Sequence, residues 1–264
     1  MDRCIEPLVP PLLSAPAWRT RGKGTSGSWA IWLLRMMIAI VLRGWLKFAH
    51  RLSIDGIEHL PSEGSFILIA NHASHLDTLC LQAIFPLRKL HRVFSAASAT
   101  YFFCSLHRWA AAVIVANALP LHRRMHLRES LTDCRNLLAA RGNVLILYPE
   151  GTRSTNGQMG SFRPGIGALV AGTAIPVIPC YLKGAGSALA KGRWFPRPFR
   201  IRLRIGEALT YPFIASDRAS HQFVARDLEQ AVRELSTSMS AGSRSKPIVL
   251  AMSSATALFA GNKI

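Results

Sequence analysis

Five short apolar runs, separated by stretches with helical periodicity, constrain the fold more than any other feature of the sequence. The runs are SFILIA, LHRVFSA, NVLILYP, IPVIPCYL and FRIRLRIG, and most are bounded by Gly, Pro or Asn, as β-strands commonly are. The first, third and fourth runs are almost continuously apolar, which is typical of strands that are covered on both faces. We therefore expect them to form the centre of a sheet.

Helical stretches alternate with these runs. We expect helices over Leu76–Phe85, Ala96–Ala116 (with an interruption), His126–Ala140, Pro164–Thr173 and about Ser220–Met239. The last is amphipathic, and its apolar side holds Phe223, Leu228, Val232 and Leu235. Alternating strands and helices predict an α/β fold with a mixed, mainly parallel sheet flanked by helices.

The chain divides into four predicted segments. Residues 1–27 are rich in Pro, Gly, Ser and Arg and predict a disordered lead that does not resemble a signal peptide. Residues 28–51 predict one helix, and residues 52–239 predict the folded domain. Residues 240–264 form a tail to which the pattern assigns no role.

The predicted helix over residues 28–51 has the length of a membrane span, but basic residues interrupt it. Each Arg at the centre of a bilayer would cost about 2.5–3.5 kcal/mol. On a helical wheel, one side carries Arg35, Arg43, Lys47 and Arg51, and the other carries Trp29, Leu34, Met37, Ile38, Val41, Trp45 and Phe48. This amphipathic pattern predicts a helix lying in the membrane interface. An ordinary surface helix packed on the core is the other interpretation.

The charge is strongly unbalanced, with 32 Lys and Arg against 14 Asp and Glu and a net charge of +18. No acid occurs between Asp77 and Glu129 or between Glu150 and Glu207. Such an excess favours an acidic partner, either nucleic acid or an anionic membrane surface, although a solvated basic face is the simpler explanation. The five cysteines are scattered without CxxC spacing, which disfavours a disulfide framework and a zinc site and fits a reducing cytoplasm.

The segment NHASHLD follows the first strand run and brings polar groups to its carboxyl end. On one helix His72 and Asp77 would point about 140° apart, but a bend between them would let the carboxylate bond one ring nitrogen and leave the other basic. Ser74 and Asp77 also form a capping box of the S-x-x-D type, in which Asp77 satisfies backbone amides. The two interpretations are compatible, since a carboxylate has a second oxygen. His75 competes for the active role, but its place in the helix start disfavours it.

The segment YPEGTRS ends the third strand run in a Pro-Glu-Gly turn. In a parallel sheet this loop and His72 would open on the same edge, where α/β proteins bind ligands. Arg153 offers a guanidinium for phosphate or carboxylate, Thr152 a hydroxyl, and Gly151 close approach of the backbone. A structural turn closed by a Glu150–Arg153 pair is the simpler alternative. Arg163, in SFRPGIG, precedes a helix start that could also attract an anion.

Together these segments resemble the glycerolipid acyltransferase superfamily. NHASHLD resembles its H-x-x-x-x-D motif, YPEGTRS its F-P-E-G-T-R-S block, SFRPGIG its F-[KR]-x-G segment, and IPVIPCYLKG its proline-bearing last block. The order and spacing agree over roughly residues 52–209, and the similarity is greatest to bacterial 1-acylglycerol-3-phosphate acyltransferases. Tyr148 replaces the usual Phe, a difference expected to matter little.

The resemblance implies a role for each motif. His72 would be the general base and Asp77 its orienting group, without a covalent acyl-enzyme. Acceptor binding would fall to Glu150, Gly151, Thr152, Arg153, Arg163 and Arg123, with Arg124 as the alternative to Arg123.

The implied reaction moves a fatty acyl group from acyl-CoA or acyl carrier protein to lysophosphatidate, with no metal or other cofactor. We expect the protein at the cytoplasmic face of the inner membrane, bound to anionic lipid and not to nucleic acid. A lyso-ornithine lipid or another lysophospholipid is an alternative acceptor. A non-catalytic basic protein that binds membranes or nucleic acid is the alternative from another class.

Overall fold

The computed structural model describes residues 28–98, 115–121, 127–193 and 195–240. Its strands are β1 (Ser53–Asp55), β2 (Phe66–Ala70), β3 (Val93–Ser98), β4 (Ala118–Leu121), β5 (Val144–Leu147), β6 (Thr173–Lys183), β7 (Arg202–Ile205) and β8 (Leu209–Tyr211). They form one sheet in the order β1-β7-β6-β2-β5-β3-β4, with β8 also paired to β6. The pairs are parallel except for β6 with β7 and β6 with β8. The predicted mixed, mainly parallel sheet is confirmed.

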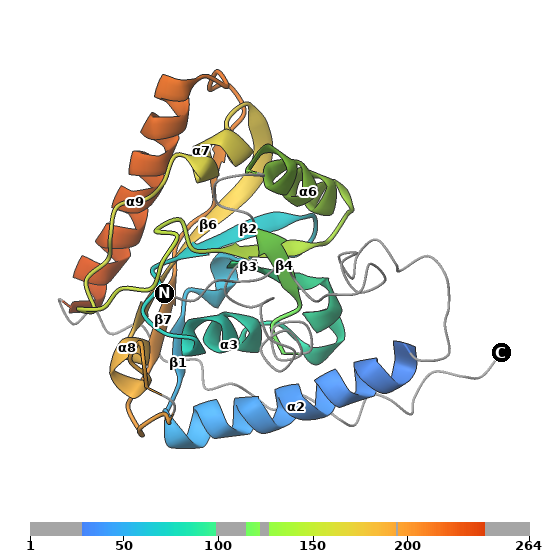
Figure 1. The fold of residues 1–264 in the computed structure, drawn as a ribbon, viewed down its shortest axis with the longest axis vertical. Helices are drawn as coiled ribbons and strands as arrows, with labels where there is room; N and C mark the ends of the chain where they lie inside the picture. Colours follow the sequence, from blue (N-terminus) through green and yellow to red (C-terminus); the bar gives the residue numbers. More distant parts are fainter. Residues whose placement is uncertain (1–27, 99–114, 122–126, 194, 241–264) are drawn as a thin grey trace, which may run out of the picture.

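Helices cover both faces of this sheet (Figure 1). The α-helices are α2 (Ser28–Ala49), α3 (Leu76–Ala83), α6 (Leu127–Ala139), α7 (Gly165–Val170), α8 (Ala185–Ala188) and α9 (Arg218–Ser240), and two 3-10 turns are η1 (Ile57–His59) and η2 (Leu87–Arg92). Helices α2, α3 and α8 lie on one face of the sheet, and α6, α7 and α9 lie on the other.

Strand β2 lies at the centre of the sheet, between β6 and β5. All five of its residues are buried. Side chains alternate between the faces of a strand, so Leu68 joins the core beneath α3 while Ile67 and Ile69 join the core beneath α7 and α9. A strand with two buried faces must be apolar throughout, which is why FILIA reads as a continuous run.

Several sequence-based boundaries were wrong. Residues 96–98 end strand β3 rather than begin a helix, because they continue its pairing with β4. Leu90–Arg92 belong to η2, and β3 therefore begins at Val93, three residues after the start of the run LHRVFSA. In α9 the buried side includes Val224, Leu228 and Val232, whereas Phe223 is 57% exposed. Phe223 lies about 140° around the helix from Leu228, and Val224 occupies the place predicted for it. The short strands β1, β4 and β8 were not predicted.

Helix α2 is present, and Arg35 and Arg43 on its basic side point toward the protein, whereas Arg51 is exposed. The guanidinium of Arg43 donates hydrogen bonds to the carbonyl oxygens of Gln82 and Phe85 at the end of α3. Arg35 Nη2 donates to Asn117 Oδ1 at 3.2 Å. These contacts give α2 a fixed rotation about its axis. Burial lowers the pKa of Arg43, which nevertheless keeps its place because two carbonyls satisfy it.

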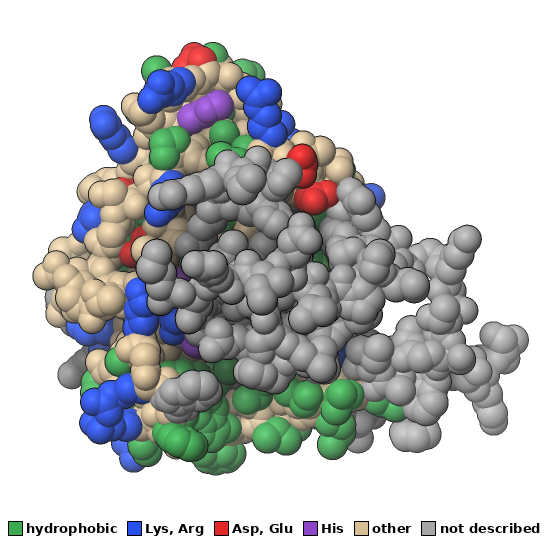
Figure 2. Space-filling model, viewed as in Figure 1, with side chains coloured by type: hydrophobic (Ala, Val, Ile, Leu, Met, Phe, Trp, Pro, Cys, Tyr) green, Lys and Arg blue, Asp and Glu red, His purple; other side chains and the backbone are tan. Residues whose placement is uncertain are grey.

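The apolar side of α2 consequently faces outward. Met37, Val41 and Phe48 are 60%, 66% and 77% exposed. Figure 2 shows hydrophobic side chains gathered along the lower edge of the molecule, over α2. Trp45, predicted to share this apolar side, instead packs edge-on against His50, with ring centroids 4.4 Å apart. Within the described ranges, no helix combines the length and hydropathy needed to cross a bilayer.

Candidate active site

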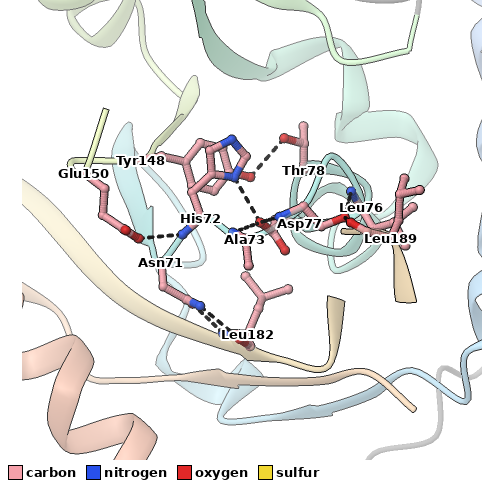
Figure 3. A network of polar contacts seen from close by, with 11 residues as sticks. Asn71, His72, Ala73, Leu76, Asp77, Thr78, Tyr148, Glu150, Leu182 and Leu189 are labelled. Atoms are coloured by element: carbon pink, nitrogen blue, oxygen red, sulfur yellow. Dashed lines mark hydrogen bonds and ion pairs between the residues drawn. The ribbon is translucent and has the colours of Figure 1, made fainter. Parts of the chain in front are cut away.

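Two segments that are far apart in the chain meet at the carboxyl edge of the sheet. Strands β2 and β5 are parallel neighbours, with Leu68 opposite Ile146, so the residues after each strand leave the same edge. The turn that follows β2 is His72–Asp77, and the loop that follows β5 is Tyr148–Phe162. Their meeting was predicted from the sheet type, and the structure confirms it (Figure 3).

The His72 ring is bonded to the Asp77 carboxylate across the predicted bend. His72 Nδ1 and Asp77 Oδ2 lie 2.9 Å apart, and the two side chains are 17% and 0% exposed. The same Oδ2 accepts hydrogen bonds from the backbone N–H groups of Ala73 and Ser74, both at 2.8 Å. Asp77 is therefore both a cap of the turn and the partner of the histidine.

All three donors converge on one oxygen, whereas the sequence analysis assigned the histidine to the second. Asp77 Oδ1 is buried and has no hydrogen-bond partner among the described residues. The Ser74 hydroxyl accepts from the N–H of Leu76 at 3.2 Å and donates to the carbonyl of Leu189 at 2.8 Å. The turn is thus held from α3 and from the residue after α8.

This geometry decides which ring nitrogen is available for chemistry. An ionised carboxylate only accepts hydrogen bonds, so Nδ1 carries the proton and donates it to Asp77. The lone pair is then on Nε2, and Figure 3 shows the second ring nitrogen on the side away from Asp77. A neutral imidazole held in this tautomer is suited to take a proton from a hydroxyl group. The ring that Asp77 holds is that of His72, and His75 lies at the cap position of α3.

Glu150 holds the main chain of the same histidine. Its carboxylate accepts from the His72 backbone N–H at 2.7 Å through Oε1 and from the Gly160 N–H at 2.8 Å through Oε2. The Ser154 N–H donates to the His72 carbonyl at 2.8 Å. Burial raises the pKa of Glu150, and the two amide hydrogen bonds oppose that rise. The structure gives Glu150 this supporting role, and its predicted contact with an acceptor stays a prediction.

Two of the other predicted binding residues, Gly151 and Arg163, lie against each other beside the main chain of Glu150. Gly151 adopts a φ of +74°, and a Cβ there would lie 2.7 Å from Arg163 Nε, so glycine is needed for two reasons. Arg163 Nε donates to the Glu150 carbonyl at 3.2 Å. Thr152 is exposed and Arg153 is half-buried. Arg123 and Arg124 lie outside the described residues.

Tyr148 is a site residue that the sequence analysis undervalued. Its ring stacks on the His72 ring, with centroids 3.9 Å apart and planes 14° apart. Its hydroxyl lies 2.9 Å from Thr78 Oγ1. Burial, together with the charge of Asp77, raises the pKa of Tyr148 well above its usual value, so the phenol stays neutral. The hydroxyl that distinguishes Tyr from the usual Phe therefore links β5 to α3 beside the histidine.

Asn71 was also missed. Its side chain donates to the Leu182 carbonyl at 3.0 Å and accepts from the Leu182 N–H at 2.8 Å, which extends the β2–β6 pairing by one residue. The available signal was a polar amide directly after a fully apolar strand, since a buried amide needs partners. Within the described part of the chain, no group of three or more His, Cys, Asp and Glu side chains is arranged to hold a metal ion.

The family follows from comparison with known proteins. A family model described as Acyltransferase matches residues 51–183, half of the chain, and includes both the His72–Asp77 turn and the Tyr148–Phe162 loop. The chain therefore belongs to the acyltransferase family.

Named relatives act on one kind of acceptor. A chloroplast 1-acyl-sn-glycerol-3-phosphate acyltransferase of Arabidopsis thaliana is 33% identical over 148 residues, covering 54% of this chain and 39% of the relative. A 1-acyl-sn-glycerol-3-phosphate acyltransferase of Pseudomonas aeruginosa is 26% identical over 209 residues, covering 78% of this chain and 72% of the relative. The chain thus spans about two fifths of the chloroplast relative's length.

A solved structure shares the fold. The 1-acyl-sn-glycerophosphate acyltransferase of Thermotoga maritima superposes with a TM-score of 0.55 at 24% sequence identity, covering 77% of this chain and 79% of that one. At this identity the similarity supports the α/β architecture described above.

Proposed function

We propose that the protein transfers a fatty acyl group from an acyl thioester to the free hydroxyl of lysophosphatidate, which gives phosphatidate. The observation that carries the proposal is the His72–Asp77 pair, with a 2.9 Å hydrogen bond that leaves Nε2 as a base at the carboxyl edge of the sheet. The acceptor follows the names of the relatives, which specify 1-acyl-sn-glycerol-3-phosphate.

The proposed reaction needs no covalent enzyme intermediate. His72 Nε2 takes the proton of the acceptor hydroxyl as its oxygen attacks the thioester carbonyl carbon, a C–O bond forms, and the C–S bond breaks. The proton held by His72 then passes to the departing thiolate of CoA or of the carrier protein. His72 begins the next turnover neutral.

The described cysteines support a direct transfer, because they are poor nucleophiles. Cys80, Cys134 and Cys180 are buried, and burial raises the pKa of each thiol, that of Cys134 to about 12. A thiol reacts as its thiolate, so a raised pKa suppresses acyl transfer through these sulfurs.

The loop after β5 offers cations for the acceptor phosphate. Arg153 lies in the loop, next to Ser154, whose N–H donates to the His72 carbonyl. Arg163 directly follows the loop and donates to the Glu150 carbonyl. A guanidinium bound to the phosphate would hold the lysophosphatidate while its hydroxyl reaches Nε2. The exposed apolar side of α2 supports a protein that works at a membrane surface, and we place it at the cytoplasmic face of the inner membrane as part of the proposal.

The first test replaces His72 with Ala and measures acyl transfer with one labelled thioester. We expect turnover to fall by about 10²- to 10⁴-fold, the usual contribution of a general base. The matched control is His75→Ala, which should retain most of the activity. Near-normal turnover of a folded His72→Ala protein would remove this residue from the mechanism, and loss of activity only in His75→Ala would reverse the assignment.

The acceptor is tested separately with a panel of lysolipids. Lysophosphatidate should be preferred over lyso-ornithine lipid and lysophosphatidylglycerol with the same donor. A preference for either of the others would keep the acyl transfer and change the acceptor. No transfer to any lysolipid would favour the non-catalytic alternative.

A further inference from the structure

The loop between α8 and β7, residues 191–200, is described except at position 194, and it presents cations and aromatic rings together. Lys191, Arg193, Arg197 and Arg200 are exposed. Phe195 is 84% exposed and Phe199 is 48% exposed. Two exposed rings on one short loop, surrounded by cations, make this loop a candidate interaction site, because grouped apolar surface with a polar rim is typical of such sites.

This loop is held in place by its main chain. The Arg197 N–H donates to the Ala188 carbonyl at 2.7 Å, and His50 Nδ1 lies 3.1 Å from the Phe199 carbonyl oxygen. Gly184 adopts a φ of +98°, and a Cβ at this position would lie 2.1 Å from the Arg200 carbonyl oxygen. The side chains point outward from a fixed backbone, so their exposure is a property of the fold.

The loop adjoins the outward apolar side of α2. His50, whose Nδ1 contacts the Phe199 carbonyl oxygen, comes directly after α2. Phe48, in the last turn of α2, is 77% exposed. The Ile201 N–H donates to the His50 carbonyl at 2.9 Å and strengthens the junction. Figure 1 shows α8 beside the end of α2, and Figure 2 shows Lys and Arg side chains next to hydrophobic ones at that corner.

The loop also adjoins the active-site turn. Ser74, in the turn between His72 and Asp77, donates its hydroxyl proton to the carbonyl of Leu189, two residues before the loop. A Cβ on Gly186 in α8 would lie 3.0 Å from the Ala73 side chain. The residues just before the loop therefore contact the turn that carries His72.

Helix α2 needs such a neighbour if it is to meet an anionic bilayer. An interfacial helix commonly keeps its cations at the headgroups while its apolar side enters the lipid. In α2 the guanidinium groups of Arg35 and Arg43 are instead bonded to Asn117 and to the end of α3. The outward side of α2 is apolar, and the nearby loop carries exposed cations.

We propose that Lys191, Arg193, Arg197 and Arg200 bind the anionic headgroups of a bilayer and that the Phe195 ring inserts, so that the membrane surface spans this loop and the apolar side of α2. The inference deepens the proposed function, because the docked bilayer would be the source of the lysolipid. The acidic acyl carrier protein is the other anionic occupant. The bilayer is favoured because the loop that carries the exposed rings is bonded through its main chain to His50, directly after the exposed Phe48 of α2, whereas charge alone would serve a carrier protein.

The experiment measures binding of the full chain to vesicles of phosphatidylcholine, with and without phosphatidylglycerol. The test variant is Arg193→Gln/Arg197→Gln/Arg200→Gln, which leaves the main-chain hydrogen bonds intact. At low salt we expect its partition coefficient on phosphatidylglycerol vesicles to fall by about 10- to 100-fold, with little change on phosphatidylcholine alone. High salt should reduce the difference, since it screens exposed charges.

The matched control removes the same charge elsewhere. Arg128, Arg218 and Arg226 are exposed on α6 and α9, which lie on the other face of the sheet. Their triple change to Gln should leave vesicle binding close to that of the parent. Phe195→Ser should weaken binding to both kinds of vesicle by about 10-fold, because it removes an inserted ring. Thermal unfolding of each variant confirms that it is folded.

Three outcomes would overturn the docking proposal. The loop variant could bind vesicles as the control variant does, or Phe195→Ser could bind them as the parent does. The loop variant could also lose binding to acyl carrier protein while it keeps binding to vesicles, which would assign the loop to that partner.

Vesicle binding also separates this inference from the proposed chemistry. The His72→Ala protein should bind vesicles like the parent. If no lysolipid is acylated but the loop variant still loses vesicle binding, the docking proposal stands and the proposed function falls.

Discussion

The turn after β2 and the loop after β5 each contribute one buried carboxylate, and the two carboxylates act on different parts of the same histidine. Asp77 is fully buried and bonds the His72 ring through Nδ1. Glu150 is 7% exposed and bonds the His72 backbone N–H. One carboxylate sets the tautomer and direction of the imidazole, and the other sets where its main chain lies.

The comparison shows why acidic residues near a histidine are not interchangeable. Asp77 has three donors on one oxygen, and one of these is the reactive ring. Glu150 has one backbone amide on each oxygen, and these amides belong to two different segments. Changing Asp77 should therefore damage chemistry more than stability, and changing Glu150 should damage both.

The largest expected effect among these tests is that of Asp77→Asn. The amide keeps the shape but loses the charge that stabilises the imidazolium, so we expect kcat to fall by about 10²- to 10⁴-fold. KM for the lysolipid should change little, because Asp77 bonds Nδ1 of the His72 ring and the acceptor hydroxyl would meet Nε2. Steady-state kinetics of a variant with parental secondary structure measure both values. A kcat within threefold of the parent would show that Asp77 is only a cap.

Glu150→Gln should have a smaller effect on turnover and a clear effect on stability. A glutamine offers one acceptor oxygen for two amide donors, so either the His72 or the Gly160 N–H loses its partner. An unsatisfied buried amide costs about 1–3 kcal/mol, and we expect turnover to fall by about 10-fold as His72 moves. Denaturant unfolding and kinetics measure the two effects. Parental values in both would contradict the supporting role of Glu150.

The pH dependence of unfolding gives a second measure of Glu150. Its pKa is raised in the folded protein, so between the ordinary and the raised value the folded state binds more protons than the unfolded state. The contribution of Glu150 to the free energy of unfolding therefore falls as pH rises through this window. Glu150→Gln should remove that negative slope, and an unchanged slope in urea titrations across the window would contradict the raised pKa.

Tyr148→Phe should produce the smallest change, because the ring remains stacked on His72. Loss of the bond between the Tyr148 hydroxyl and Thr78 should cost about 0.5–1.5 kcal/mol of stability. Thr78→Val should cost more than Tyr148→Phe, since it leaves the phenol hydroxyl buried without a partner. The double variant should be close to Tyr148→Phe alone. Thermal unfolding of the four proteins measures the coupling, and strictly additive changes would show that the two groups are independent.

Local patterns were enough to predict much of the fold. Burial on both faces requires β2 to be apolar throughout, so the run FILIA is visible without any tertiary information. The short strands β1, β4 and β8 were missed because strands of three or four residues carry too little pattern. Helix α2 was predicted as amphipathic, but the pattern did not reveal that Arg35 and Arg43 bond to other parts of the domain.

The His72–Asp77 pair and the amphipathic pattern of α2 were contained in the sequence alone, because each depends on residues within one short segment. Only the tertiary structure decided the partners that join distant segments. Glu150 reaches the His72 main chain across 78 positions of sequence, and Arg43 reaches the end of α3 across about 40. No local pattern specifies such contacts, because they exist only once β2 and β5 are paired and α2 is packed on α3. The same packing leaves the apolar side of α2 outward, next to the cations of residues 191–200.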